Sequence, residues 1–147
     1  MRKVTSPPDT QALSRHRIRS GEYLRVDIDS AHELLPMVRK ITRLAAQELE
    51  PLQQHLHNRV PADPRNVRVK LTYRKAVTAW AGKIERLGLK VHGLWQVGFD
   101  NGHGWYGWQY PERQIRYFLE YDALFRDRVL LRDSPLELQL VRRVSPT

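Results

Sequence analysis

The segment from Arg65 to Lys90 limits the possible folds of this chain more than any other stretch. Its apolar residues recur four and three positions apart, which is the spacing of one face of an α-helix. Each helical residue turns about 100° around the axis, so a second stripe lies nearly opposite the apolar one. The segment therefore predicts one amphipathic helix that buries one stripe and exposes the other. The apolar stripe is Tyr73, Val77, Trp80, Ile84 and Leu87, and the polar stripe is Arg68, Thr72, Lys75, Ala79, Lys83, Arg86 and Lys90.

A second helix is predicted to precede this one and to pack against it. Ser30 and Glu33 have the spacing of a capping box, so the helix is expected to begin at Ala31. Its apolar stripe is Leu34, Val38, Ile41, Ala45, Leu49, Leu52 and Leu56. Pro36 and Pro51 each lack the backbone donor of a helical hydrogen bond, so a kink is expected at both. The short connection between the two helices favours an antiparallel hairpin.

After the second helix, the period of the sequence changes to that of a β-strand. Apolar and aromatic residues alternate with polar or small ones over 95–99, 105–110 and 115–121, and turn-forming residues separate these segments. A shorter alternation over 23–28 predicts a strand, and 134–144 predicts a final short helix. The expected fold class is therefore α+β: a kinked antiparallel helical hairpin packed on a three-stranded antiparallel β-meander, with a short N-terminal strand.

Length and composition are those of a single globular domain. At 147 residues, with 41% hydrophobic residues, the chain can bury a core of its own. Residues 1–21 are polar with clustered arginines, so we expect a flexible basic arm before a single α+β domain over 22–147. The sequence has no cysteine, no apolar run of the ~20 residues that span a membrane, and no apolar region of a secretory signal at its start. A soluble, cytoplasmic protein without a membrane partner is expected.

The basic charge of the chain is concentrated in the predicted second helix. The whole chain has a net charge of +9, and the 65–90 segment has eight basic residues and one acid, a net +7. A dense cationic surface favours a polyanionic partner, although it also serves solubility alone in some proteins. We therefore expect a non-enzymatic, polyanion-binding accessory protein whose partner is RNA or a ribosomal particle. The expected contact residues are Arg68, Lys75, Lys83, Arg86 and Lys90.

The predicted meander is rich in aromatic residues. Tyr106, Trp108 and Tyr110 alternate on one face of its middle strand, and Trp105 lies on the other face. One of the two faces must pack on the helical hairpin. Rings on the opposite face would be free to stack on RNA bases, or to form an interface with a protein partner or a second copy. Core packing of both sets of rings is the simpler alternative.

Patterns typical of catalysis or metal binding are scarce. The sequence contains no phosphate-binding glycine loop and no nucleophile motif. His55 and His57 are two residues apart, whereas a zinc-binding pair on a helix needs a spacing of four. No metal and no cofactor are therefore expected. The one acid/base group is Asp100 and His103 in a loop, with Glu112 in the next turn and Glu120 on the third strand, which would support proton transfer. A small enzyme built on these residues is the third hypothesis, after polyanion binding and protein interaction.

Three segments of the sequence carry a family resemblance: AHELLPMVRKI (31–41), ERLGLKV (85–91) and the stretch 93–128. They resemble the uncharacterised DUF2203 family, in which a helix of the type ANxLLP and a second helix ending in LG precede GlvDFP, LCWxxGE, IxxWHe and GFxxR. The matching positions are Leu34, Leu35, Pro36, Trp108, Glu112, Ile115, Glu120 and Arg126. Gln96, Gly107 and Leu119 stand where the motifs have Asp, Cys and His. The resemblance implies a helical hairpin with a small sheet, and no established activity.

Overall fold

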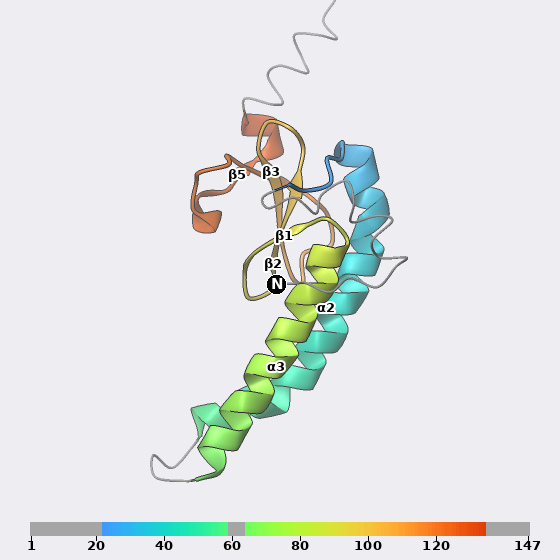
Figure 1. The fold of residues 1–147 in the computed structure, drawn as a ribbon. Coiled ribbons are helices and arrows are strands. Elements are labelled where there is room, and N and C mark those ends of the chain that lie inside the picture. The colour runs from blue at the N-terminus through green and yellow to red at the C-terminus, as the bar shows by residue number, and fades with distance from the viewer. Residues whose placement is uncertain (1–21, 59–63, 135–147) are drawn as a thin grey trace, which may run out of the picture.

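The computed structural model describes residues 22–58 and 64–134. These residues form two helices and a five-stranded antiparallel sheet, so the predicted α+β class is confirmed (Figure 1). The elements are α2 (Ile28–His57), α3 (Arg65–Arg86), β1 (Lys90–Gly93), β2 (Gln96–Asp100), β3 (Trp105–Gln109), β4 (Tyr117–Leu119), the 3-10 helix η1 (Phe125–Asp127), β5 (Val129–Leu130) and the 3-10 helix η2 (Leu131–Asp133). The predicted arm over 1–21, and the predicted final helix beyond residue 134, lie outside the described residues.

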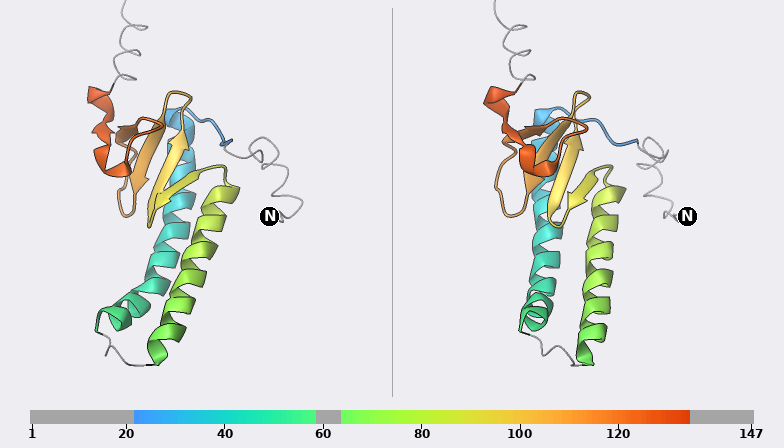
Figure 2. Two further views of the ribbon diagram at one scale, coloured as in Figure 1. Left: turned by 60° about the vertical axis from the view of Figure 1, so that its left-hand side comes forward. Right: turned by 90° about the vertical axis from the view of Figure 1, so that its left-hand side faces the viewer.

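The two long helices lie side by side and run in opposite directions, which confirms the predicted hairpin (Figure 2). On α3, Trp80 and Ile84 are buried as predicted, while Tyr73 and Val77 are half-buried, as is Leu87 at the C-cap. The indole nitrogen of Trp80 donates a hydrogen bond of 2.9 Å to the hydroxyl oxygen of Thr42 on α2. The apolar stripe of α3 therefore faces α2, and this buried hydrogen bond fixes the two helices relative to each other.

α2 begins three residues earlier than the predicted start at Ala31. Its N-cap is Asp27 rather than Ser30, because the Asp27 carboxylate accepts a hydrogen bond of 2.8 Å from the backbone nitrogen of Ser30. The helix then continues through both Pro36 and Pro51. Figure 2 shows one clear change of direction, in the last turns of α2. A bend in that region is expected, because Pro51 cannot donate to the preceding turn.

The sheet has five strands in sequence order, not three. β1 was missed because the predicted helix was extended to Lys90, whereas α3 ends at Arg86. β5 has only two residues and leaves no periodic signal. The predicted N-terminal strand is reduced to an isolated parallel bridge between Arg25 and Asp100. Backbone contacts such as the 2.8 Å hydrogen bond from the Val26 nitrogen to the Asp100 oxygen hold this segment, together with the buried side chain of Val26.

The end of α3 connects the hairpin to the sheet through a local stop signal. Gly88 has φ +89°, a conformation that glycine adopts without strain. The Gly88 nitrogen bonds to the Glu85 oxygen, and the Leu89 nitrogen to the Ile84 oxygen, which together make a Schellman motif. The apolar side chains of Leu89 and Ile84 are both fully buried. The chain therefore leaves the helix at a fixed angle and enters β1 directly.

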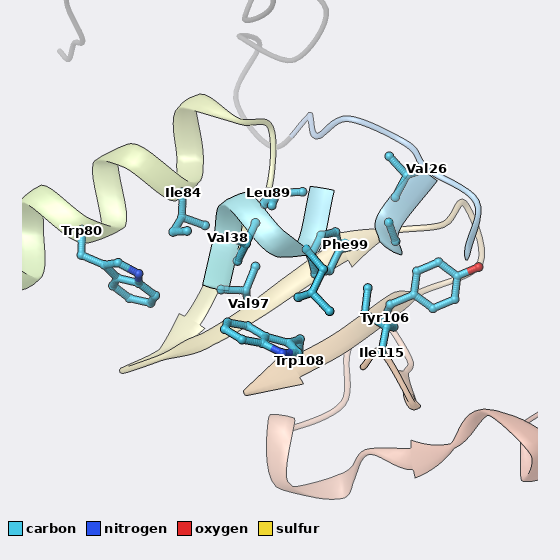
Figure 3. Packing of buried hydrophobic residues seen from close by; sticks show 12 residues of the cluster. Val26, Val38, Trp80, Ile84, Leu89, Val97, Phe99, Tyr106, Trp108 and Ile115 are labelled. Atoms are coloured by element: carbon cyan, nitrogen blue, oxygen red, sulfur yellow. The ribbon is translucent and has the colours of Figure 1, made fainter. Parts of the chain in front are cut away.

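The main core lies between one face of the sheet and one end of the hairpin. Val97 and Phe99 on β2, together with Tyr106 and Trp108 on β3, point toward the helices (Figure 3). The helices contribute residues from Ile28 to Ala45 on α2 and from Trp80 to Ile84 on α3, and Leu87 follows directly after α3. The other end of the hairpin extends away from the sheet (Figure 2). Within the described residues, neither α2 nor α3 has an apolar stretch long enough to cross a membrane.

Candidate nucleic-acid interface

Four of the five predicted basic contact residues lie on the exposed surface of α3: Arg68, Lys75, Lys83 and Arg86. Arg68 and Arg86 are eighteen residues apart, which is five full turns, so they lie at about the same angle around the axis. Lys75 lies within about 20° of both, and Lys83 about 60° from Arg86. At a rise of about 1.5 Å per residue, this row spans about 27 Å. We call Arg68, Lys75, Lys83 and Arg86 the basic row.

The charge of the described residues is distributed unevenly among the elements. α3 contains seven basic residues and one acid, a net +6, whereas α2 contains three basic residues and four acids, a net −1. Residues 87–134 contain six of each, a net charge of zero. The positive potential of the described part of the chain therefore originates on α3, where the side chains of the basic row are exposed.

Lys90, the fifth predicted contact residue, does not belong to the basic row. It is the first residue of β1, and its side chain is half-buried. The Lys90 ammonium nitrogen lies 5.8 Å from the centre of the Tyr23 ring and 5.9 Å from that of Trp105. These distances are within the range of cation–π attraction. The predicted helical position of Lys90 is wrong because the helical spacing was counted past Gly88, where the helix has already stopped.

Three of the four aromatic residues predicted for stacking or for an interface are buried, and the fourth is half-buried. Tyr106 and Trp108 are buried in the main core, and the Trp108 indole donates a hydrogen bond of 2.8 Å to the Glu112 carbonyl oxygen. Trp105 is buried on the opposite face of the sheet, and Tyr110 is half-buried. The simpler alternative, core packing on both faces, therefore describes the three buried rings. Their burial leaves them no face on which a base or a partner protein could stack.

Trp105 is the centre of a second cluster, on the sheet face that points away from the hairpin. Its ring makes edge-to-face contacts with the rings of Tyr23, His92 and Tyr121, at centroid distances of 5.3–5.4 Å. Leu119 and Phe125 complete this small core. The second face is thus covered by residues from both ends of the described chain. Sequence alternation assigned Trp105 to this face correctly but carried no signal for what covers it.

His92 fills the space beside a glycine in this second cluster. A Cβ atom on Gly98 would collide with the His92 ring, so only glycine leaves room for it there. The His92 Nε2 and Trp105 Nε1 atoms are buried, and neither has a hydrogen-bond partner among the described residues. Burial, and secondly the charge of Lys90, lower the pKa of His92 from 6.5 to about 4. As the pH falls, His92 is therefore protonated in the unfolded chain before it is protonated in the folded one. Folding stability consequently falls as the pH drops from about 6.5 toward 4.

The predicted acid/base group does not form a connected site. The Asp100 carboxylate accepts hydrogen bonds from the Tyr121 hydroxyl at 2.6 Å and from the Gly102 nitrogen at 2.9 Å. Burial, followed by the hydrogen bond and charge of Asp100, raises the pKa of Tyr121 to about 12. His103 and Glu120 are exposed, and neither side chain bonds to Asp100. In the described segments, no group of three His, Asp or Glu residues is arranged to hold a metal ion.

The ion pair between Arg128 and Glu112, beside the sheet, was not predicted from the sequence. Arg128 and Glu112 form a two-pronged ion pair with distances of 3.0 Å and 2.9 Å, and Arg128 also donates to the Gly107 carbonyl oxygen. The guanidinium carbon lies 4.1 Å from the Tyr117 ring centre. Arg126, the residue first matched to the GFxxR motif, is exposed. The spacing of the motif from Phe125 identifies Arg128 instead, and its contacts fasten the chain after β4 to β3.

Comparison with known proteins gives one result. The sequence profile of the family described as "Uncharacterized conserved protein (DUF2203)" matches residues 26–131, so the chain belongs to the DUF2203 family. The match covers both helices and the whole sheet, and it confirms the resemblance found in the sequence motifs. Searches among curated proteins and among solved structures give no match.

Proposed function

We propose that this DUF2203 protein is a non-enzymatic, polyanion-binding accessory protein of the cytoplasm, and that its partner is RNA, free or in ribosomal particles. The observation that carries the proposal is the exposed basic row on α3. This helix has a net charge of +6, whereas the neighbouring elements are neutral or slightly acidic. Such a row attracts phosphates and increases association rates in a salt-dependent way. The alternative of a partner that docks on the aromatic sheet face has less support, because three of its four rings are buried.

The arrangement of the hairpin supports access to the basic row. The sheet packs on the end of the hairpin where α2 begins and α3 ends. From Arg68 to Lys75, α3 lies beyond that core, in the part of the hairpin that extends away from the sheet (Figure 2). A polyanion that lies along this side of α3 would contact basic side chains without any change in the core. Because phosphates carry no base information, binding should be independent of sequence.

The test is a salt series of affinities for generic RNA. Each phosphate contact on a single strand contributes about 0.7 to the fall of log affinity with log salt, and about 0.9 on a duplex. Replacing two members of the row, Lys75→Glu with Arg86→Glu, should weaken binding and lower that slope by about 1.4 to 1.8. Both side chains are exposed, so the fold should remain intact, which circular dichroism and a urea melt would verify.

A matched control variant distinguishes binding by the basic row from attraction to the net charge of the protein. Lys70 and Arg74 are also exposed basic residues of α3, but they lie about 160° and 120° around the helix axis from Arg68. Lys70→Glu with Arg74→Glu makes the same change of net charge on the other side of the helix. The control should keep the slope of the parent protein. Equal losses in the two double variants would indicate only nonspecific attraction, and no binding by the parent at about 50 mM salt would refute the proposal.

A further inference from the structure

The surroundings of the basic row are unsuited to holding unpaired bases. Proteins that bind single strands stack bases on aromatic rings, each worth about 1–3 kcal/mol. On α3 the aromatic residues are Trp80, which is buried, and Tyr73, which is half-buried and whose hydroxyl accepts a hydrogen bond of 3.4 Å from Gln53. Within 22–58 and 64–134, Tyr121 is the one aromatic residue among the large exposed hydrophobics, and it follows β4 rather than α3. The row therefore offers charge without a stacking platform.

Small residues lie between the basic side chains of the row. Thr72 lies between Arg68 and Lys75, and its hydroxyl bonds to the Arg68 carbonyl oxygen of its own helix at 3.0 Å. Ala79 lies between Lys75 and Lys83 and projects only a methyl group. Among the described residues, Leu71, which is 52% exposed and lies about 40° from Lys75 around the axis, is the one large apolar side chain beside this part of the row. A stiff, straight polyanion would be able to lie along it.

From these features we infer that the substrate class of the basic row is a double-stranded nucleic acid, bound through its phosphates without base readout. The inference rests on the proposed function and adds to it the kind of strand. A duplex carries one charge per about 1.7 Å of axis and is already stiff, so its phosphates meet a rigid row about 27 Å long with little loss of entropy. A flexible single strand must be ordered to make the same contacts, and it gains no stacking in return.

The experiment compares three RNA probes of equal length, two single strands and the duplex that they form with each other. Oligo(A), oligo(U) and their duplex, each of about 20 nucleotides, all exceed the length of the row at about 3.4 Å per step. Fluorescence anisotropy with the full chain, across a salt series, gives the affinity and the slope for each probe. We expect the duplex to bind at least tenfold more tightly than either strand, with a slope of about −3, the value for three to four contacts. A duplex of mixed sequence should bind equally well.

The possible results separate the inference from the function on which it rests. If either single strand binds as tightly as the duplex, or if the two duplexes differ by more than tenfold, the inference is wrong while polyanion binding stands. If none of the probes binds at about 50 mM salt, the proposed function itself is wrong. The Lys75→Glu, Arg86→Glu variant must lose the preference for duplex, and the Lys70→Glu, Arg74→Glu control must keep it. A preference that survives in the first variant would place the duplex elsewhere on the protein.

Discussion

Replacement of Trp80 by alanine should be among the most destabilising single changes in this protein. The side chain is only 2% exposed, and its ring packs edge-to-face on Trp95 with a centroid distance of 4.9 Å. Removing a buried tryptophan costs about 3–5 kcal/mol of folding free energy, and the lost ring pair favours the upper part of that range. Domains of this size have a total stability of about 5–15 kcal/mol, so the variant should unfold at a much lower urea concentration.

Urea unfolding followed by circular dichroism measures this loss. Leu71→Ala is a suitable control, because Leu71 lies on the same helix and is 52% exposed. The control should change stability by less than about 0.5 kcal/mol, as is usual for surface positions. A loss below about 1 kcal/mol for Trp80→Ala would show that the apolar stripe of α3 does not form the seam of the hairpin.

The buried hydrogen bond between the helices has a test of its own in a double-mutant cycle. Trp80→Phe removes the donor and Thr42→Val removes the acceptor of the 2.9 Å bond. Each single change leaves a buried polar group without its partner, whereas the double change removes both groups. The two losses should therefore add to more than the loss in the double variant, by about 0.5–1.5 kcal/mol. A coupling energy of zero would mean that the bond does not stabilise the fold.

Of three further predictions, two concern the second sheet face and one concerns a glycine of α3. His92→Phe removes the group whose pKa is lowered to about 4, so the stability of this variant relative to the parent should rise as the pH falls from about 7 to 4.5. Urea melts at the two pH values check this, and a difference that does not change with pH would contradict it. Gly107→Ala would place a Cβ atom 3.0 Å from Arg128 Cδ, so a loss of about 1–3 kcal/mol is expected in the same melts. Gly82→Ala, inside α3, meets only the flexible end of Arg86 at 3.4 Å and should stabilise the protein by about 0.5–1 kcal/mol.

The parts of the fold that the sequence predicted correctly are those with local, periodic causes. The apolar stripe of α3 identified Trp80 and Ile84 as buried residues, and alternation placed Trp105 and Tyr106 on opposite faces of β3. The errors lie where a local signal competed with periodicity. Gly88 stops α3, although the helical spacing of the basic residues, counted along the sequence, continues to Lys90. A glycine with positive φ ends a helix whatever residues follow it.

The candidate surface was predictable to a similar extent. Exposure of the basic row follows from the helical wheel alone, because the side opposite a buried stripe must face solvent. The burial of the meander rings was not predictable, since it depends on contacts between distant parts of the chain. Tyr23 and Tyr121 are nearly a hundred residues apart, and they cover the same ring of Trp105. No local pattern carries that information.

The substituted motif positions explain why a function is better sought on α3 than on the sheet. Alternation places Gln96, Gly107 and Leu119 on the sheet face away from the hairpin, where the family motifs have Asp, Cys and His. In this chain, Leu119 pairs with Trp105 and is buried, and the absence of a side chain at Gly107 makes room for Arg128. A face that would hold three polar groups is thus packed as a second core. The polar groups that do lie on that face are engaged in it: the Asp100 carboxylate accepts a hydrogen bond from Tyr121, and the His92 ring packs against Trp105. The dense, exposed charge that remains is on α3, and the salt-dependent binding experiments are aimed at that helix.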